Sequence, residues 1–282
     1  MVSFIFRPSS LDTIIRFFLY FLILFFPYNP VVIEICIIFS LIVLAWKRLL
    51  LKDFRFGRNF INKFIFLACG ILLLGSILFH GGMQYFFVKI LDGAVIYFLV
   101  IEVFQKKQHV YVALGLFTLA IFVAALTCIF QFYFTQQNVL KILRLDPHYF
   151  IGYIVGVIPF LFALVFMTGK KLRYRFLTIF FLSICVWALI LTFSRGALLA
   201  ATLGIVFVSS SFHQKFKIFF KREPHLVILS VGILAGIFAF VVQALLNAKF
   251  FSVQLLSCFG FMVGVQVAII NFIKGRQSYG AA

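Results

Sequence analysis

Residues 110–134 read VYVALGLFTLAIFVAALTCIFQFYF and contain no Asp, Glu, Lys or Arg. A helix needs about 20 consecutive apolar residues to cross the hydrocarbon core of a bilayer, and this stretch is long enough. Similar apolar stretches follow one another along the chain and are separated by short polar or basic segments. Because lipid offers the backbone no hydrogen-bond partners, the pattern predicts an all-α, polytopic transmembrane helical bundle.

Ten membrane spans are predicted from these stretches. They cover residues 14–26, 31–46, 60–79, 85–104, 110–134, 149–168, 176–193, 197–212, 225–246 and 251–272. The first two are short and are joined by Pro27-Tyr28-Asn29-Pro30, which favours either a tight helical hairpin or a partly re-entrant pair. No linker or soluble domain interrupts the pattern, so residues 1–282 are interpreted as a single integral-membrane domain.

The composition supports a membrane location and gives an orientation. Hydrophobic residues make up 65% of the chain and charged residues 11%, against about 25% charged in a soluble domain. The net charge of +18 would suggest nucleic acid in a soluble protein, but basic cytoplasmic loops explain it here, so no nucleic-acid partner is expected. With the N-terminus in the cytosol, 20 of the 25 Lys and Arg residues fall on the cytosolic side. Ten spans then place both termini in the cytoplasm, with membrane lipids around the bundle.

The cysteines indicate no metal or cofactor. Each of the five lies inside an apolar stretch, and none has CxxC spacing. Small, buried packing residues are the expected role.

Arg195 is the cation that topology explains least. It lies at the predicted outer turn between two spans, and no other charged residue occurs from residue 176 to 212. The guanidinium is a planar fork of donors that suits phosphate, and Gly196 lets the backbone approach a ligand closely. The alternative is an arginine that reaches the membrane interface or caps a helix end.

A second polar group lies in the outer segment 141–150. It contains Lys141, Arg144, Asp146 and His148 ahead of a new span. Asp146 followed by Pro147 is typical of a helix start, which would explain that pair structurally. Two cations on the less favoured side, together with Arg195, suit a substrate that presents phosphate at the outer leaflet.

Other ionisable groups lie within the spans. Lys89 and Asp92 are three residues apart, so they share a helix face and are expected to form a structural pair near His80. Glu34 also lies near the outer end of its span. These groups allow an alternative interpretation as a small-molecule transport pathway, although inverted repeats are not evident.

Two of these elements resemble a known family. Residues 192–199, TFSRGALL, resemble the SRGA signature of the O-antigen ligase and O-antigen polymerase superfamily. Residues 146–150, DPHYF, resemble that family's element DPNYF, with His148 where Asn is common, and Pro159 follows in the next span as in many members. The resemblance covers roughly residues 60–273.

The resemblance implies a glycosyltransferase of the bacterial inner membrane. Members move glycan from an undecaprenyl-diphosphate carrier to lipid A-core, in lipopolysaccharide biosynthesis, or to another glycan. By resemblance Arg195 would bind the carrier diphosphate, assisted by Arg144 or Lys141. A general base near the acceptor hydroxyl is also expected, and His148, His80 and Asp92 are the candidates.

One departure keeps other functions open. Family members commonly carry a large periplasmic loop with a further Arg and a functional His, whereas the corresponding outer loop here is only residues 247–250. A degenerate, non-catalytic protein that binds carrier lipid is therefore an alternative to the enzyme. The sequence leaves the donor and the acceptor open.

Overall fold

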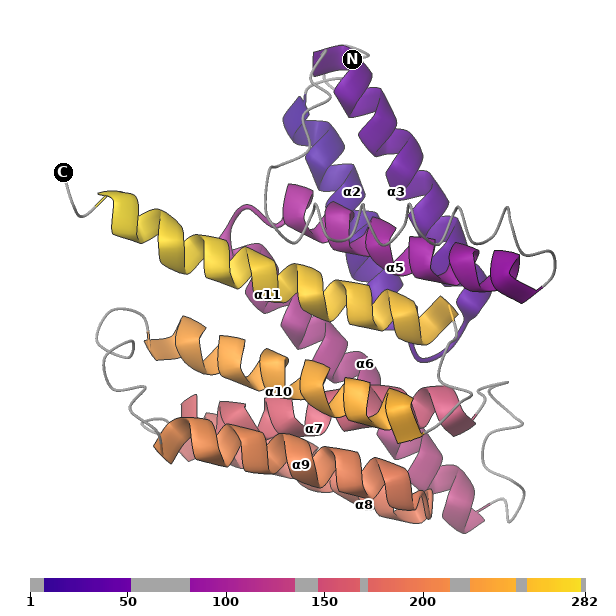
Figure 1. Cartoon of the computed structure of the whole chain (residues 1–282), viewed down its shortest axis with the longest axis vertical. Coiled ribbons are helices and arrows are strands. Elements are labelled where there is room, and N and C mark those ends of the chain that lie inside the picture. Colours follow the sequence, from indigo (N-terminus) through magenta and orange to yellow (C-terminus); the bar gives the residue numbers. More distant parts are fainter. Residues whose placement is uncertain are drawn as a thin grey trace.

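The computed structural model of the chain describes residues 8–51, 82–134, 147–167, 172–213, 224–246 and 253–279. These residues form α-helices and no strand, so the predicted all-α class is confirmed for them (Figure 1). The helices are α2 (Pro8–Phe25), α3 (Pro30–Leu51), α5 (Gly82–Val103), α6 (Lys107–Phe134), α7 (Pro147–Met167), α8 (Leu172–Leu191), α9 (Arg195–His213), α10 (Pro224–Leu246) and α11 (Val253–Tyr279). The predicted span 60–79 lies outside the described residues. Ten spans and cytoplasmic termini remain predictions.

The described helices have the composition of membrane spans. Five are long and apolar enough to cross a bilayer: α3, α6, α8, α10 and the part of α11 from Leu255 to Ile273. Large apolar side chains also cover the outside of the bundle, including Phe134 at 73% exposure and Leu245 at 82%. A surface of this kind requires an apolar environment, as lipid provides.

The helices from α5 to α11 run in alternating directions, so their connections fall at two opposite ends of the bundle (Figure 1). We call the end at which α9 begins the Arg195 end, and the end at which α8 begins the Arg173 end. The α2–α3 pair packs beside α5 and α6. Helices α11 and α10 lie between α5 and α9 (Figure 1).

The connection between α2 and α3 is a tight turn, and the two helices form a hairpin. The choice between a hairpin that spans the bilayer and a partly re-entrant pair stays a prediction. The Tyr28 backbone N–H donates to the Phe25 carbonyl at 2.9 Å, which closes the turn. The Asn29 side chain accepts a hydrogen bond from the Val31 N–H at 2.9 Å and caps α3. Both helices lie side by side along their length (Figure 1).

Glycines allow two helix pairs to approach closely. Gly260 and Gly264 are four residues apart on α11, and they face Gly93, Tyr97 and Val100 of α5. Because a side chain at Gly260 would collide with the Gly93 backbone, the contact depends on the missing Cβ. Helix α10 approaches α7 in a similar way. Small residues at such spacing are the usual means of close helix packing in lipid, where burial against a neighbour gains little hydrophobic energy.

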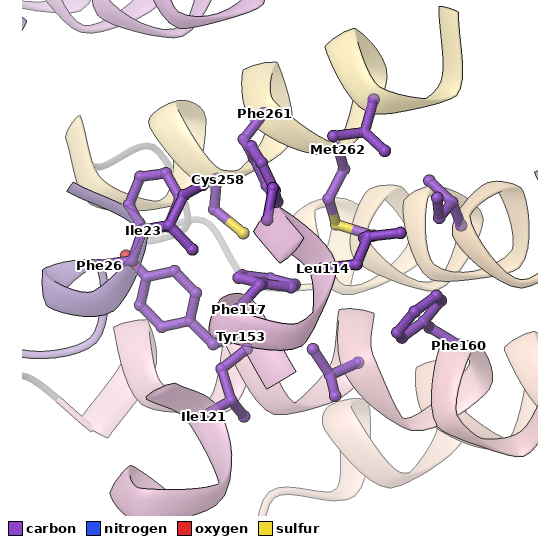
Figure 2. Packing of buried hydrophobic residues seen from close by; sticks show 14 of the residues in the cluster. Ile23, Phe26, Leu114, Phe117, Ile121, Tyr153, Phe160, Cys258, Phe261 and Met262 are labelled. Carbon is purple, nitrogen blue, oxygen red and sulfur yellow. The ribbon is translucent and has the colours of Figure 1, made fainter. Parts of the chain in front are cut away.

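Aromatic side chains fill the centre of the bundle (Figure 2). Phe26 at the α2–α3 turn, Phe117 of α6 and Phe261 of α11 meet with ring centroids 5.3–6.3 Å apart. Tyr153 of α7 stacks on Phe26 at 6.4 Å. All four side chains are at most 2% exposed, so this cluster joins the N-terminal hairpin to the rest of the protein.

A network of ion pairs joins α2, α3 and α5 at the Arg173 end. The Lys47 ammonium donates to Asp12 at 2.7 Å and to Glu102 at 3.1 Å. The second Glu102 oxygen accepts from Arg48 at 2.7 Å. The Lys47 side chain is only 7% exposed, and the network balances two cations with two carboxylates. This pairing explains why α3 continues to Leu51, beyond the predicted end of the span at residue 46.

Replacing Lys47 with Met is expected to destabilise the protein by about 3 kcal/mol, because it leaves Asp12 and Glu102 partly buried without their shared cation. The matched control is Lys106→Met, at an exposed position just before α6. Thermal unfolding of both purified variants in the same detergent measures the difference. Equal melting temperatures would show that the network contributes no net stability.

Candidate functional site

The SRG sequence forms a tight turn between two antiparallel helices. α8 ends at Leu191, and the backbone N–H groups of Thr192 and Phe193 donate to carbonyls of its last turn at 3.1 and 3.0 Å. Phe193 has a φ of 51°, in the left-handed region that reverses the chain direction after a helix. A non-glycine residue in this region is uncommon, and it marks the turn as locally strained.

Ser194 is the N-cap of α9. Its carbonyl accepts the first hydrogen bond of the helix, from the Leu198 N–H at 3.1 Å, and its hydroxyl accepts from the Ala197 N–H at 3.4 Å. Arg195 is therefore the first helical residue, and Gly196 is the second. Their N–H groups come before the helix has acceptors for them, and they donate to no other described residue, so they can meet a ligand.

Arg195 projects into the surroundings at this helix start. It is exposed and forms no ion pair with any described residue. A helix N-terminus carries partial positive charge, which makes it an unfavourable place for an unpaired cation. The guanidinium and the free N–H groups together attract an anion with several oxygen atoms, such as a phosphate or diphosphate.

A buried polar side chain, that of Gln243 in α10, lies next to the turn at Gly196. A Cβ at Gly196 would lie 3.6 Å from Gln243 Oε1 of α10, so the glycine faces that side chain. Gln243 is 1% exposed, and its Oε1 has no hydrogen-bond partner among the described residues. A buried polar atom without a partner costs stability. Sequence reasoning missed Gln243, although it is the only strongly polar side chain between His225 and Asn247 apart from Ser230.

The two family-like elements begin neighbouring helices at the same end. α7 starts at Pro147, as the Asp-Pro pair predicted, and both α7 and α9 start at the Arg195 end (Figure 1). The helices are in direct contact: a Cβ at Gly204 of α9 would collide with the Pro159 ring of α7. The fold therefore brings the starts of both motifs to the same end of adjacent helices.

The structure does not gather all the predicted site residues. Asp92 is half-buried in α5, where it interacts electrostatically with the exposed Glu34 of α3. α10 and α11 lie between that helix and α9, which begins at Arg195 (Figure 1). The backbones of Lys89 and His148 belong to α5 and α7. Their side chains lie outside the described part, as do His80, Lys141, Arg144 and Asp146.

No group of three or more His, Cys, Asp or Glu residues in the described ranges is arranged to hold a metal ion. The four cysteines among them are buried and form no disulfide. Comparison with models of protein families, with curated proteins and with solved structures finds no match to the chain.

Proposed function

We propose that this chain is an O-antigen ligase-like protein of cell-surface polysaccharide assembly. It would transfer glycan from an undecaprenyl-diphosphate carrier to lipid A-core or to a glycan acceptor. The observation that carries the proposal is the turn at Ser194-Arg195-Gly196, where an exposed arginine stands at a capped helix start. This turn suits an anionic ligand. Because the segment resembles the SRGA signature, we propose that this ligand is the carrier diphosphate.

The chemistry needs charge stabilisation at the leaving group. An acceptor hydroxyl attacks the anomeric carbon, the bond from that carbon to the diphosphate oxygen breaks, and negative charge grows on the diphosphate. Arg195 and the N–H groups of the first turn of α9 would stabilise this charge, and the helix fixes the N–H groups before the reaction starts. Arg144 and Lys141 would assist from the preceding segment. The hydroxyl proton passes to a base, for which His148, His80 and Asp92 are the candidates. Asp92 belongs to α5, and α10 and α11 lie between α5 and α9 (Figure 1).

The proposal includes a location and an orientation. The chain would cross the bacterial inner membrane about ten times with both termini in the cytoplasm, and the Arg195 end would face outward. The alternating helix directions support this orientation, since they put Arg195 at the opposite end from the ion-pair network and from Arg173. The distribution of Lys and Arg supports it independently.

The non-catalytic alternative uses the same site. A protein that binds carrier lipid without transferring glycan would need Arg195 and the capped turn but no general base. The short segment 247–250 favours this alternative. The transport alternative would use Glu34 of α3 with Lys89 and Asp92 of α5, and Glu34 interacts electrostatically with Asp92. Flux in proteoliposomes that Asp92→Asn abolishes would favour transport.

Ser194→Asp is expected to separate binding from folding. Aspartate caps a helix as well as serine does, so the stability should change little. The added carboxylate would repel the diphosphate, however, and weaken carrier binding by about tenfold or more. Ser194→Asn is the matched control, because asparagine also caps a helix and adds no charge.

The proposed activity is tested with purified chain, a labelled undecaprenyl-diphosphate-linked oligosaccharide and lipid A-core or free glycan as acceptor. Transfer by the wild type and by Ser194→Asn, with loss in Ser194→Asp, is the expected result. Carrier binding without transfer to either acceptor would overturn the enzymatic proposal in favour of the non-catalytic alternative.

A further inference from the structure

An apolar groove runs between α6, α7 and α8 near the Arg173 end. Its volume is about 280 Å³. The walls include Leu114 and Gly115 of α6, Leu161 and Leu164 of α7, and Leu177 and Phe181 of α8. This groove is separate from the Arg195 turn, which lies at the other end of α8 and α9 (Figure 1).

The groove presents hydrocarbon to its occupant. Its two threonines turn their hydroxyls to their own helices: Thr118 donates to the Leu114 carbonyl at 2.8 Å, and Thr178 donates to the Tyr174 carbonyl at 2.9 Å. A Cβ at Gly115 would meet no atom within 4 Å, so this glycine leaves a notch in the wall. Such a space suits a flexible alkyl chain.

A second hollow lies on α8 beside exposed basic residues. It is lined by Arg173, Tyr174, Phe176, Leu177 and Phe180, and Leu177 also lines the groove. Arg173 and Arg175 are both exposed in the first turns of α8. The sequence from 168 to 191 contains four cations, at 170, 171, 173 and 175, and no Asp or Glu. Arg173 therefore adds a positive charge to the hollow that shares Leu177 with the groove.

We propose that this groove binds an anionic glycerophospholipid of the leaflet at the Arg173 end. One acyl chain lies in the groove, and the phosphate lies at Arg173. The apolar walls of the groove suit an acyl chain, and the Arg173 guanidinium suits the phosphate of the headgroup. Leu177 of α8 lines both the groove and the hollow that contains Arg173. The site does not depend on the proposed glycan transfer.

Headgroup charge should decide which lipid is held. The bilayer is as apolar as the groove, so moving a chain between them gains little hydrophobic energy. The guanidinium, by contrast, binds a phosphate as a fork of donors, and a basic residue near the membrane surface favours anionic lipid. The site is therefore expected to prefer phosphatidylglycerol to phosphatidylcholine with the same acyl chains.

The test is native mass spectrometry of the full chain with equal amounts of these two lipids. The wild type should retain phosphatidylglycerol preferentially, and Arg173→Ala should reduce that preference by about fivefold. Gly115→Leu should fill the notch and lower the retention of both lipids. The control is Val112→Leu, which adds bulk at an exposed position of α6 outside the groove.

Three results would overturn the proposal. The first is equal retention of the two lipids by the wild type. The second is an unchanged preference in Arg173→Ala, whose exposed position makes a folding defect unexpected. The third is a lipid-free dimer that Gly115→Leu dissociates, which would assign the groove to a second copy of the chain.

Discussion

Gly260→Leu is expected to prevent stable packing of α11 against α5. A Cβ at this position would lie 2.7 Å from the Gly93 carbonyl carbon and 2.9 Å from its Cα. Both are backbone atoms of a helix, so they cannot turn aside as a flexible side chain would. The two helices must separate, which also disturbs the contact of Gly264 with Val100. Forcing extra volume into a packed contact costs about 1–3 kcal/mol or more.

Measurement of the folded yield and the melting temperature in detergent checks this prediction. We expect Gly260→Leu either to fail to accumulate or to melt about 5–10 °C lower. Gly115→Ala is the matched control, since a Cβ there meets open space and alanine favours a helix by about 1 kcal/mol over glycine. If both variants melt at the wild-type temperature, the close contact between α5 and α11 is wrong.

Helix positions were largely predictable because apolar length is a strong signal in a membrane protein. The span predicted at 110–134 is α6, Lys107–Phe134, and the span predicted at 225–246 is α10, Pro224–Leu246. The end of α3 was not predictable from hydropathy. Lys47 and Arg48 look like residues of a cytoplasmic loop, whereas in the structure they belong to the helix and pair with Asp12 and Glu102.

The local structure of the candidate site followed from short sequence signals. Serine is a typical N-cap residue, as Ser194 is for α9, and the pair Asp146-Pro147 predicts the start of α7. The order in which helices pack has no such signal. For this reason sequence reasoning grouped Asp92 with Arg195, whereas α10 and α11 lie between their helices (Figure 1).

Part of the packing could have been found in the sequence. Gly260 and Gly264 have the spacing GxxxG, as do Gly232 and Gly236, and this spacing predicts close helix contacts in a membrane. The spacing does not say, however, which other helix packs against the two glycines. The approach of Gln243 to Gly196 likewise depends on how α10 meets α9, so a single glutamine in an apolar helix could not be assigned to the site.

Arg195→Ala is expected to weaken binding of undecaprenyl diphosphate by about 10- to 150-fold. Hydrogen bonds to a charged group contribute about 1.5–3 kcal/mol, and the fork of the guanidinium makes two of them with a phosphate. Arg195→Lys should keep part of the affinity, because an ammonium supplies the charge without the fork. The fold should be unaffected, since Arg195 is exposed and forms no ion pair with the described residues.

Arg173→Ala is the matched control for Arg195→Ala. Both arginines are exposed in the first turn of a helix, and they lie at opposite ends of the bundle (Figure 1). The control matters because undecaprenyl diphosphate is itself an anionic lipid, which any basic membrane surface attracts. A site at the SRG turn depends on Arg195 and is insensitive to Arg173.

The most direct test of the carrier site is native mass spectrometry of the purified chain with undecaprenyl diphosphate, comparing the wild type, Arg195→Ala and Arg173→Ala. The account predicts that the wild type and Arg173→Ala retain the carrier, and that Arg195→Ala releases it. Retention by Arg195→Ala equal to that of the wild type would contradict the assignment of the diphosphate to the Ser194-Arg195-Gly196 turn, and with it the proposed function.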